Sequence, residues 1–192
     1  RPMKDSGIDW IGQIPKEWTC RKIKSFTSLI TKGATPKEIA VELSDSFPIR
    51  FLKSENIVDN RLLSKPEFYI SKDVHEGVLK RSALSRYDLL FVIAGASLGK
   101  VAIMDENLLP ANTNQAMAFL RFNDTQMRVQ RLIWYVLQSD VVKTYISLYA
   151  VQSAQPNISM GNLGNMRIPY SSDMDEQQEI VEYLDSKCAA ID

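Results

Sequence analysis

The sequence predicts an α/β protein of the α+β type, in which a mixed, mainly antiparallel twisted sheet packs with helices and a long coiled-coil-type helix follows. Three observations lead to this prediction. Short apolar runs rich in β-branched residues are bounded by turn residues, as core strands are. After residue 124 the apolar residues recur with the helical period, and from Met174 to Ile191 they follow the 3,4 spacing of a coiled coil.

The expected elements follow in chain order. Residues 8–18 hold two tryptophans, three isoleucines and a proline without a regular period, so we expect an extended arm lying against a core. Alternating or apolar runs predict strands at residues 20–30, 48–54, 66–70, 88–94, 100–105 and 115–122. Helices are predicted at residues 71–84 with Ser71 as N-cap, at 124–137 with Asp124 as cap, and at 140–149. The stretches 55–62 and 150–166 are expected to be loops.

The segment "GASLGK" has the look of a phosphate-binding loop but departs from that pattern. Its two glycines stand one residue too close together, Val101 occupies the position of the magnesium-binding hydroxyl, and the next residues alternate like a strand. Two apolar strands joined by a short glycine-containing segment predict a β-hairpin, in which Gly95 and Gly99 adopt positive φ and Ser97 and Lys100 project from the tip. A nucleotide-binding enzyme is therefore the least favoured hypothesis.

No catalytic or metal centre is recognisable in the sequence. Cys20 and Cys188 lie far apart without a CxxC or a neighbouring histidine, which indicates neither a disulfide nor a zinc site and fits a reduced, cytoplasmic setting. The single histidine, His75, has no nucleophile or carboxylate constellation around it and is expected at the surface. No apolar run reaches the roughly 20 residues needed to cross a membrane. We therefore expect a soluble, non-catalytic protein without a cofactor of its own.

The formal charge of zero conceals two oppositely charged parts. Residues 170–192 contain seven acidic residues and one basic residue, whereas residues 1–169 contain 22 basic and 16 acidic residues and so carry a net charge of +6. Such asymmetry suggests that the body and the tail face different partners. We accordingly expect one domain over residues 1–169 and a separate helical segment over residues 170–192.

Five loops share a composition that suits DNA, and they are residues 32–37, 53–56, 97–100, 112–115 and 152–159. Each follows or precedes an apolar element and is rich in Lys, Asn, Gln, Ser and Thr, the side chains that contact phosphates and base edges. Taken together on a basic body, they favour binding to double-stranded DNA. The candidate DNA-binding residues are Lys32, Thr35, Lys37, Lys53, Ser54, Asn56, Ser97, Lys100, Asn112, Asn114, Gln115, Gln152, Gln155, Asn157 and Ser159.

The last helix carries an apolar seam of the coiled-coil type. Its candidate pairing residues are Met174, Val181, Leu184, Cys188 and Ile191. The pattern is still running at Asp192, so we expect a truncated helix whose apolar face has no partner within this chain. That face would pack on a helix from outside this chain.

The assembled segments resemble a known family. They are "DSGIDWIGQIPKEW", "TKGATPK", "DLLFVIAGASLGKVAIMDENLLPANTNQAMAFLR", "AQPNISMGNLGNMRIP" and "DEQQEIVEYLDSKCAAID". Their order and spacing are similar to a target recognition domain of the specificity subunit of type I restriction-modification systems, followed by the start of its conserved helical spacer. One departure is that "IPYSSDMDEQ" stands where that family usually has a proline-rich "PLPPLxEQ"-like run.

The resemblance implies a non-catalytic DNA-specificity component that reads one half of a bipartite target. Such subunits carry two recognition domains joined by long helices, on which modification subunits dock. The modification subunits methylate adenine with S-adenosylmethionine, and a separate restriction subunit translocates and cuts DNA with ATP and magnesium, so these cofactors belong to the partners. The alternative hypothesis is a protein-interaction scaffold that uses its C-terminal helix and whose basic surface is incidental.

Overall fold

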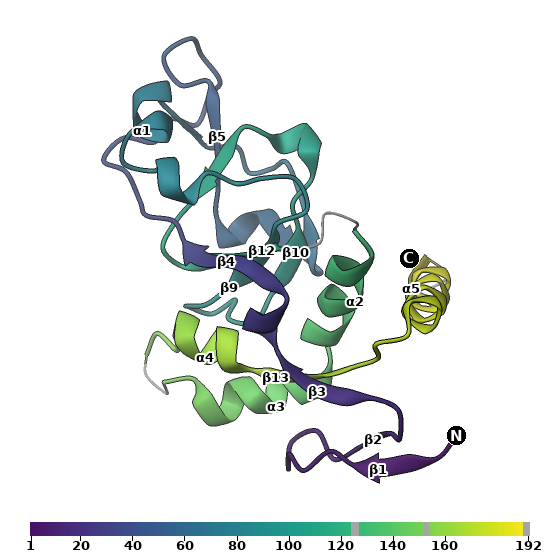
Figure 1. The fold of residues 1–192 in the computed structure, drawn as a ribbon. Helices are drawn as coiled ribbons and strands as arrows, with labels where there is room; N and C mark the ends of the chain where they lie inside the picture. Colours follow the sequence, from purple (N-terminus) through teal and green to yellow (C-terminus); the bar gives the residue numbers. More distant parts are fainter. Residues whose placement is uncertain (124–126, 152–153, 190–192) are drawn as a thin grey trace.

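A four-stranded antiparallel sheet forms the centre of the protein (Figure 1). The computed structural model describes residues 1–123, 127–151 and 154–189. The central sheet has the order β10-β9-β12-β4, formed by Val101–Ile103, Leu89–Val92, Met117–Phe122 and Thr27–Lys32. Neighbouring strands pair antiparallel throughout, as the sequence predicts for the core of the fold.

Both faces of the central sheet are covered. Leu89 and Phe91 face a cluster that includes residues of three helices, whereas Leu90 and Val92 face a second cluster shared with the neighbouring sheet. Because successive side chains of a strand point to opposite faces, a strand buried on both sides reads as a continuous apolar run. All four residues of β9 are buried for this reason.

The second sheet is mixed and has the order β11-β5-β8. It consists of Ala111–Thr113, Ile49–Leu52 and Tyr69–Ile70, with β11 parallel and β8 antiparallel to β5. Residues 111–113 lie in a segment that the sequence predicts to be a loop. They form a buried strand because the polar side chains of Asn112 and Thr113 find hydrogen-bond partners inside the protein.

Short ribbons complete the strands. The arm forms β1 (Met3–Asp5) and β2 (Gln13–Pro15), which pair with each other, and Trp10 between them packs on the core as expected. β6 (Ile57–Val58) and β7 (Arg61–Leu62) form a hairpin within the stretch expected to be a loop. Its turn residues Asp59 and Asn60 have φ of 48° and 57°, as two-residue hairpin turns require.

The strand expected at residues 20–30 is two strands. A 3₁₀ turn at Ile23–Ser25 separates β3 (Thr19–Lys22) from β4, and Ile23 at this turn is fully buried. β3 leaves the central sheet and pairs with β13 (Arg167–Tyr170). No Gly or Pro marks the break, which is why the sequence alone suggests one strand.

Five α-helices surround the sheets in the described part of the chain. They are α1 (Lys72–Glu76), α2 (Arg128–Leu137), α3 (Asp140–Tyr149), α4 (Met160–Asn165) and α5 (Met174–Ala189). Ser71 caps α1 by accepting from the Val74 amide, as predicted. α4 was not expected, and Ser159 caps it in the same way. The predicted cap Asp124 lies outside the described residues.

A buried ion pair joins two strands of the central sheet near the end where β9 begins. The Arg121 guanidinium donates to both carboxylate oxygens of Asp88, at 2.9 and 2.7 Å, and the Asp88 side chain is only 1% exposed. The Ser85 amide also donates to this carboxylate. Burial raises the pKa of Asp88, and Arg121 offsets part of that rise because its positive charge favours the ionised form.

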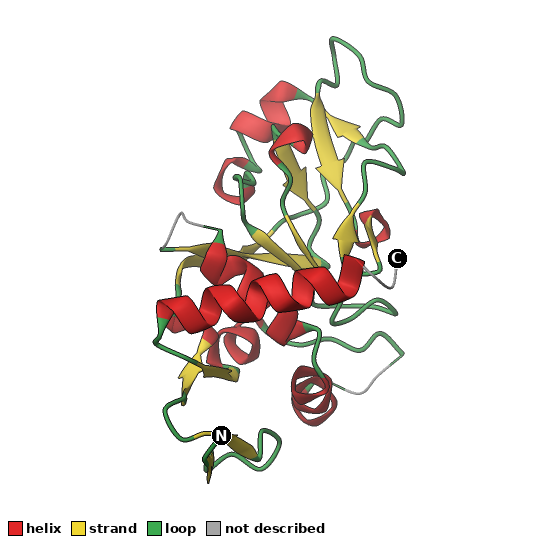
Figure 2. Cartoon of the chain, turned by 90° about the vertical axis from the view of Figure 1, so that its right-hand side faces the viewer, coloured by secondary structure: helices red, strands yellow, loops and turns green. Residues whose placement is uncertain are grey.

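Helix α5 packs against α2, which corrects the expectation that its apolar face has no partner within this chain (Figure 2). Val181 is 4% exposed, and Asp185 pairs with Arg131 and accepts a hydrogen bond from the Tyr135 hydroxyl. Burial of the ring and, after it, that hydrogen bond raise the pKa of Tyr135. The seam residue Met174 is exposed, and the predicted pairing residue Ile191 lies outside the described residues.

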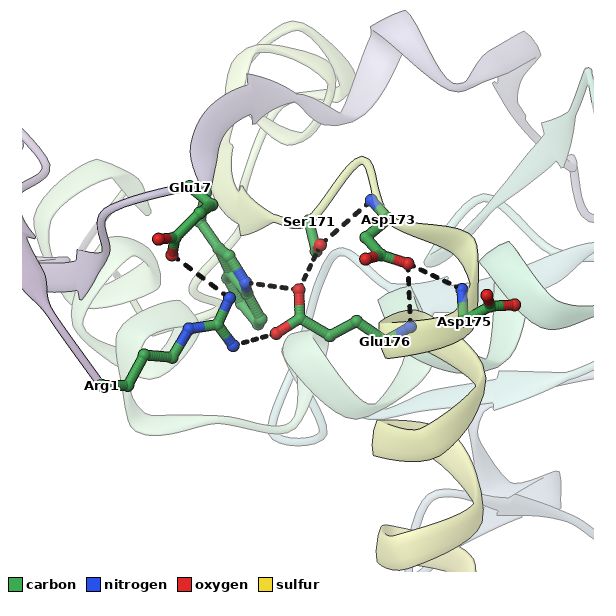
Figure 3. Close-up of polar contacts among 7 residues, drawn as sticks. Arg1, Glu17, Ser171, Asp173, Asp175 and Glu176 are labelled. Atoms are coloured by element: carbon green, nitrogen blue, oxygen red, sulfur yellow. Dashed lines mark hydrogen bonds and ion pairs between the residues drawn. The ribbon is translucent and has the colours of Figure 1, made fainter.

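The start of α5 is tied to the N-terminal arm through Glu176 (Figure 3). Its carboxylate pairs with Arg1 and accepts hydrogen bonds from the Trp18 indole N–H, at 2.9 Å, and from the Ser171 hydroxyl. These contacts, led by Arg1, hold the pKa of Glu176 below its ordinary value. The Asp173 carboxylate caps the helix by accepting hydrogen bonds from the backbone amides of Asp175 and Glu176.

Removing the guanidinium of the buried pair should destabilise the protein strongly. Arg121→Met leaves the Asp88 carboxylate buried without a counter-charge, and we expect the free energy of unfolding to fall by about 3 kcal/mol at neutral pH. Urea unfolding measures this change. The matched control is Arg86→Met, because Arg86 pairs with Glu106 at the surface and such pairs contribute about 0–1 kcal/mol. Equal losses in the two variants would contradict the assigned role of the buried pair.

The attachment of α5 should depend on pH. Because the pKa of Glu176 is lowered in the folded protein, its contribution is present above the ordinary value of 4.5 and is lost as the pH falls through the folded pKa. Glu176→Gln should therefore be less stable than the parent at pH 7, with a difference that shrinks at acid pH. Thermal melts from pH 3 to 7 test this, with the exposed Glu179→Gln as control. A difference that stays constant with pH argues against the charge effect.

Candidate nucleic-acid interface

Three of the five candidate loops lie together at one end of the central sheet. Lys32 at the end of β4 is paired with Ala118, and Val92 at the end of β9 is paired with Met117 at the start of β12. Because β4 and β9 run opposite to β12, the segments after β4 and β9 and the turn before β12 leave the sheet at the same end. In Figure 1, β4 points away from α5, so these loops and α5 occupy opposite sides of the molecule.

A very close backbone approach joins two of these loops. A Cβ atom added at Gly33 would stand 1.6 Å from the carbonyl oxygen of Thr113, which no side chain allows. The Thr35 hydroxyl donates across the same contact to Oε1 of Gln115. Residues 32–37 and the turn between β11 and β12 therefore lie in direct contact.

The fourth segment, residues 154–159, lies against the tip of the β9–β10 hairpin. The Gly95 amide donates to the Pro156 carbonyl oxygen at 3.0 Å, and the Ile158 amide donates to the Ile93 carbonyl oxygen at 2.9 Å. Ala94 and Asn157 form an isolated β-bridge. Of the candidates in this segment, Gln152 lies outside the described residues.

The fifth segment, residues 53–56, follows β5 and leaves the second sheet beside the same turn. β5 runs parallel to β11, so Leu52 and Thr113 end their strands side by side, and the Thr113 hydroxyl donates to the Leu52 carbonyl oxygen at 2.9 Å. The Lys53 ammonium lies over the Phe68 ring, 3.5 Å from its centroid. All five candidate segments thus meet around one end of the two sheets.

The hairpin at "GASLGK" forms as the sequence predicts. Val101 of β10 pairs with Phe91 of β9, and Gly95 and Gly99 have φ of 89° and 92°. The Gly99 amide donates to the Val92 carbonyl oxygen and closes the loop. A strand follows this segment where a phosphate-binding loop would require a helix.

The candidate side chains differ in their access to solvent. The exposed candidates are Lys32, Thr35, Lys37, Lys100, Gln115, Gln155, Asn157 and Ser159. The half-buried candidates are Lys53, Ser54, Ser97 and Asn114. The Lys100 ammonium lies 3.4 Å from the Ile57 carbonyl oxygen while the residue remains exposed. The exposed set combines cations, hydroxyls and amides, which are the groups that contact phosphates and bases.

Two candidates have a different role from the one that the sequence suggests. Asn56 and Asn112 are 0% exposed, so neither side chain reaches the surface in this structure. Asn56 accepts from the Lys53 amide and donates to the carbonyl oxygens of Leu63 and Pro66. These bonds close the loop behind the interface.

Asn112 likewise braces the interface from inside. Its amide donates to the Leu79 carbonyl oxygen at 3.0 Å, and its Oδ1 atom contacts Nδ1 of His75. His75 was expected at the surface, but it is half-buried because it packs beside this buried amide. A composition rich in Asn and Gln indicates polar chemistry and does not tell an exposed amide from a buried one.

Sequence reasoning missed the part played by Gly33 and Thr113. Gly33 was interpreted only as a turn residue, although its missing side chain is what lets two loops touch.

The described residues contain no group of three or more His, Cys, Asp or Glu side chains able to hold a metal ion. Over the same residues, no helix is long and apolar enough to span a membrane.

Residues 15–192 match the sequence model of the type I restriction modification DNA specificity domain. The chain belongs to that family. The assignment favours the DNA-reading hypothesis over the general interaction scaffold.

Related proteins agree with this assignment. The chain is 25% identical over 179 residues to the MjaIX type I restriction enzyme specificity subunit of Methanocaldococcus jannaschii, and the match covers 91% of the chain and 38% of that subunit. The fold matches an HsdS subunit from Thermoanaerobacter tengcongensis with a TM-score of 0.61 and 20% identity, covering 96% of the chain and 39% of the other. It also matches the type I system S subunit from M. genitalium, with a TM-score of 0.59 and 18% identity over 88% of this chain and 38% of that one. The chain therefore spans about two fifths of the length of these proteins.

Filling the space at Gly33 should separate the two loops. Gly33→Ala drives a methyl group into the Thr113 carbonyl oxygen, and we expect the free energy of unfolding to fall by at least about 1–3 kcal/mol. Urea unfolding measures the loss. Gly161→Ala is the control, because the added methyl group there meets only ordinary contact at 3.6 Å in a helix. A Gly33 variant as stable as this control would contradict the close approach.

Proposed function

We propose that this chain is a sequence-reading DNA recognition domain of a type I specificity subunit. It reads one half of a bipartite target in double-stranded DNA and thereby positions the methyltransferase and endonuclease subunits. The observation that carries the proposal is the convergence of five polar segments, far apart in sequence, at one end of two packed sheets. Loops held on a rigid scaffold can present several base-reading side chains at fixed positions.

Charge supports the same reading. Lys32, Lys37 and Lys100 are exposed around this surface and suit phosphate contacts, which hold DNA without reading its sequence. The amides and hydroxyls between them suit contacts to base edges. Asn56 and Asn112 are not assigned such contacts, because their side chains are buried and hydrogen-bonded inside the domain.

We further propose that the chain divides into a recognition domain, residues 1–169, and the start of a spacer helix, residues 170–192. α5 is acidic and lies on the side away from the loops, so like-charge repulsion keeps it from the duplex (Figure 1). Its exposed apolar residues include Met174 and Tyr183, at 55% and 61% exposure. This outward face would pair with the helix of a second recognition domain or homodimer, or with a modification subunit.

The chemistry would belong to the partner subunits. The chain brings binding groups to its loop surface, and the proposed division of labour leaves adenine methylation, with S-adenosylmethionine, to the modification subunits. Translocation and cleavage, which need ATP and magnesium, fall to the restriction subunit. Since such a complex acts on the DNA of its host and on entering DNA, we place it in the cytoplasm.

Removal of the lysine at the hairpin tip should weaken DNA binding without changing the recognised sequence. Lys100→Ala loses a phosphate contact, so affinity should fall for all duplexes and the slope of log K against log salt should flatten by about 1. The measurement is a salt titration of DNA binding by the assembled specificity and modification subunits.

Lys16→Ala is the matched control, because Lys16 is exposed on the N-terminal arm and lies outside the five segments. Its affinity and salt slope should equal those of the parent. If Lys100→Ala also matches the parent, the hairpin tip is not part of the interface. If Lys32→Ala and Lys37→Ala are equally silent, the proposed DNA surface itself is wrong.

A further inference from the structure

The turn before β12 presents two consecutive amide side chains whose oxygen atoms are each turned toward a donor of the protein. Oδ1 of Asn114 accepts a hydrogen bond from the Ala116 backbone amide at 3.2 Å. Oε1 of Gln115 accepts one from the Thr35 hydroxyl. A backbone N–H can only donate, so the Asn114 amide has its oxygen toward the protein and its nitrogen away from that contact.

The frame around these amides is firmly held. The Met117 amide donates to the Asn114 carbonyl oxygen at 3.4 Å, and β12 begins at that residue. Thr35 comes from the loop that Gly33 brings into backbone contact with Thr113. Thr35 lies two residues after this contact, so the backbone contact at Gly33 holds its hydroxyl close to Gln115.

The amide atoms that face away from these contacts are the two nitrogens. Within residues 1–123, 127–151 and 154–189, neither Nδ2 of Asn114 nor Nε2 of Gln115 donates a hydrogen bond to the protein. Gln115 is exposed and Asn114 is half-buried. Each NH₂ group can donate and cannot accept, so this turn offers donors to whatever it meets.

The bases differ in the hydrogen-bond donors and acceptors that their edges present to such a surface. In the major groove guanine presents two acceptors, N7 and O6, whereas adenine pairs one acceptor with the N6 donor and cytosine presents the N4 donor. The familiar two-bond contact of an amide with adenine needs the amide oxygen to accept from N6. At Gln115 that oxygen is bound to Thr35, and at Asn114 it is bound to the backbone.

We propose that the turn at Asn114 and Gln115 reads an acceptor-bearing base edge, guanine in the first place, and that Thr35 is a positioning residue that sets this polarity. The inference rests on the proposed DNA-reading function and deepens it. It assigns Asn114 and Gln115 the same kind of contact, although their oxygens are held by different partners.

Isosteric exchanges of donor for acceptor test the proposal. The full specificity subunit is assembled with its modification subunits, and the methylated adenines are mapped in cells that express each variant. Binding is then measured on duplexes in which every base pair of the mapped target is changed in turn. Gln115→Glu and Asn114→Asp keep the shape and the inner acceptor while replacing the outward NH₂ by an oxygen.

Each of these two variants should lose preference for guanine at one base pair by at least about tenfold, while preference at the other positions is kept. Thr35→Val frees the Gln115 oxygen, so discrimination between guanine and adenine at the same pair should fall from about tenfold to about twofold or less. Gln13→Glu and Thr19→Val are matched exposed controls outside the five segments, and the mapped target should not change in either.

Several outcomes would overturn the inference. An added negative charge that merely repels DNA lowers affinity for all duplexes equally and leaves the mapped target unchanged. A parent protein that prefers adenine or cytosine at the pair altered by Gln115→Glu shows that the turn presents an acceptor. In both cases the lysine variants at the loops would still weaken DNA binding, whereas failure of the proposed function would leave them without effect.

Discussion

The pairing of β12 with both β4 and β9 is the interaction on which the rest of the structure depends. Its register places Phe119 in one apolar cluster and Leu120 in the other, so a slip of one residue would exchange the two faces and expose core side chains to the wrong layer. The same register brings the ends of β4 and β9 to the start of β12. Core packing and the placement of the loops thus have a single cause.

Buried polar groups hold the loop surface in shape. Asn56 bonds to the backbone of Lys53, Leu63 and Pro66 behind the interface, and its replacement by an apolar residue would leave these groups without that partner. Asn112 donates to the Leu79 carbonyl oxygen and contacts Nδ1 of His75. Their rigidity keeps the exposed amides and lysines in front of them at fixed positions. Under the proposed function, such a loop would serve DNA binding in two ways, by contact at its surface and by support from within.

On the opposite side of the molecule, helix α5 is attached to the domain at several points. α5 is attached through an ion pair with Arg131, through the buried Val181, and through the Glu176 contacts at its first turn. These contacts fix the direction in which the helix leaves the domain. The helix is acidic and the loops on the other side carry exposed lysines, so the two sides differ in charge.

Local sequence was enough to predict the apolar strands of the central sheet and the hairpin at Gly95 and Gly99, because these depend on the spacing of apolar residues and on turn chemistry. The composition of the candidate loops can also be read directly from the sequence. Only the tertiary structure decided that Asn112 is buried while Gln115, three residues later, is exposed. The partner of the Asn112 amide is the carbonyl group of Leu79, 33 residues away. Likewise, the need for glycine at position 33 arises only because the Thr113 carbonyl group packs against it. Helix α5 contacts α2, and no local sequence pattern predicts a contact between segments so far apart in the chain. Local sequence sets what a side chain can bind, and the packing of distant segments sets what it meets.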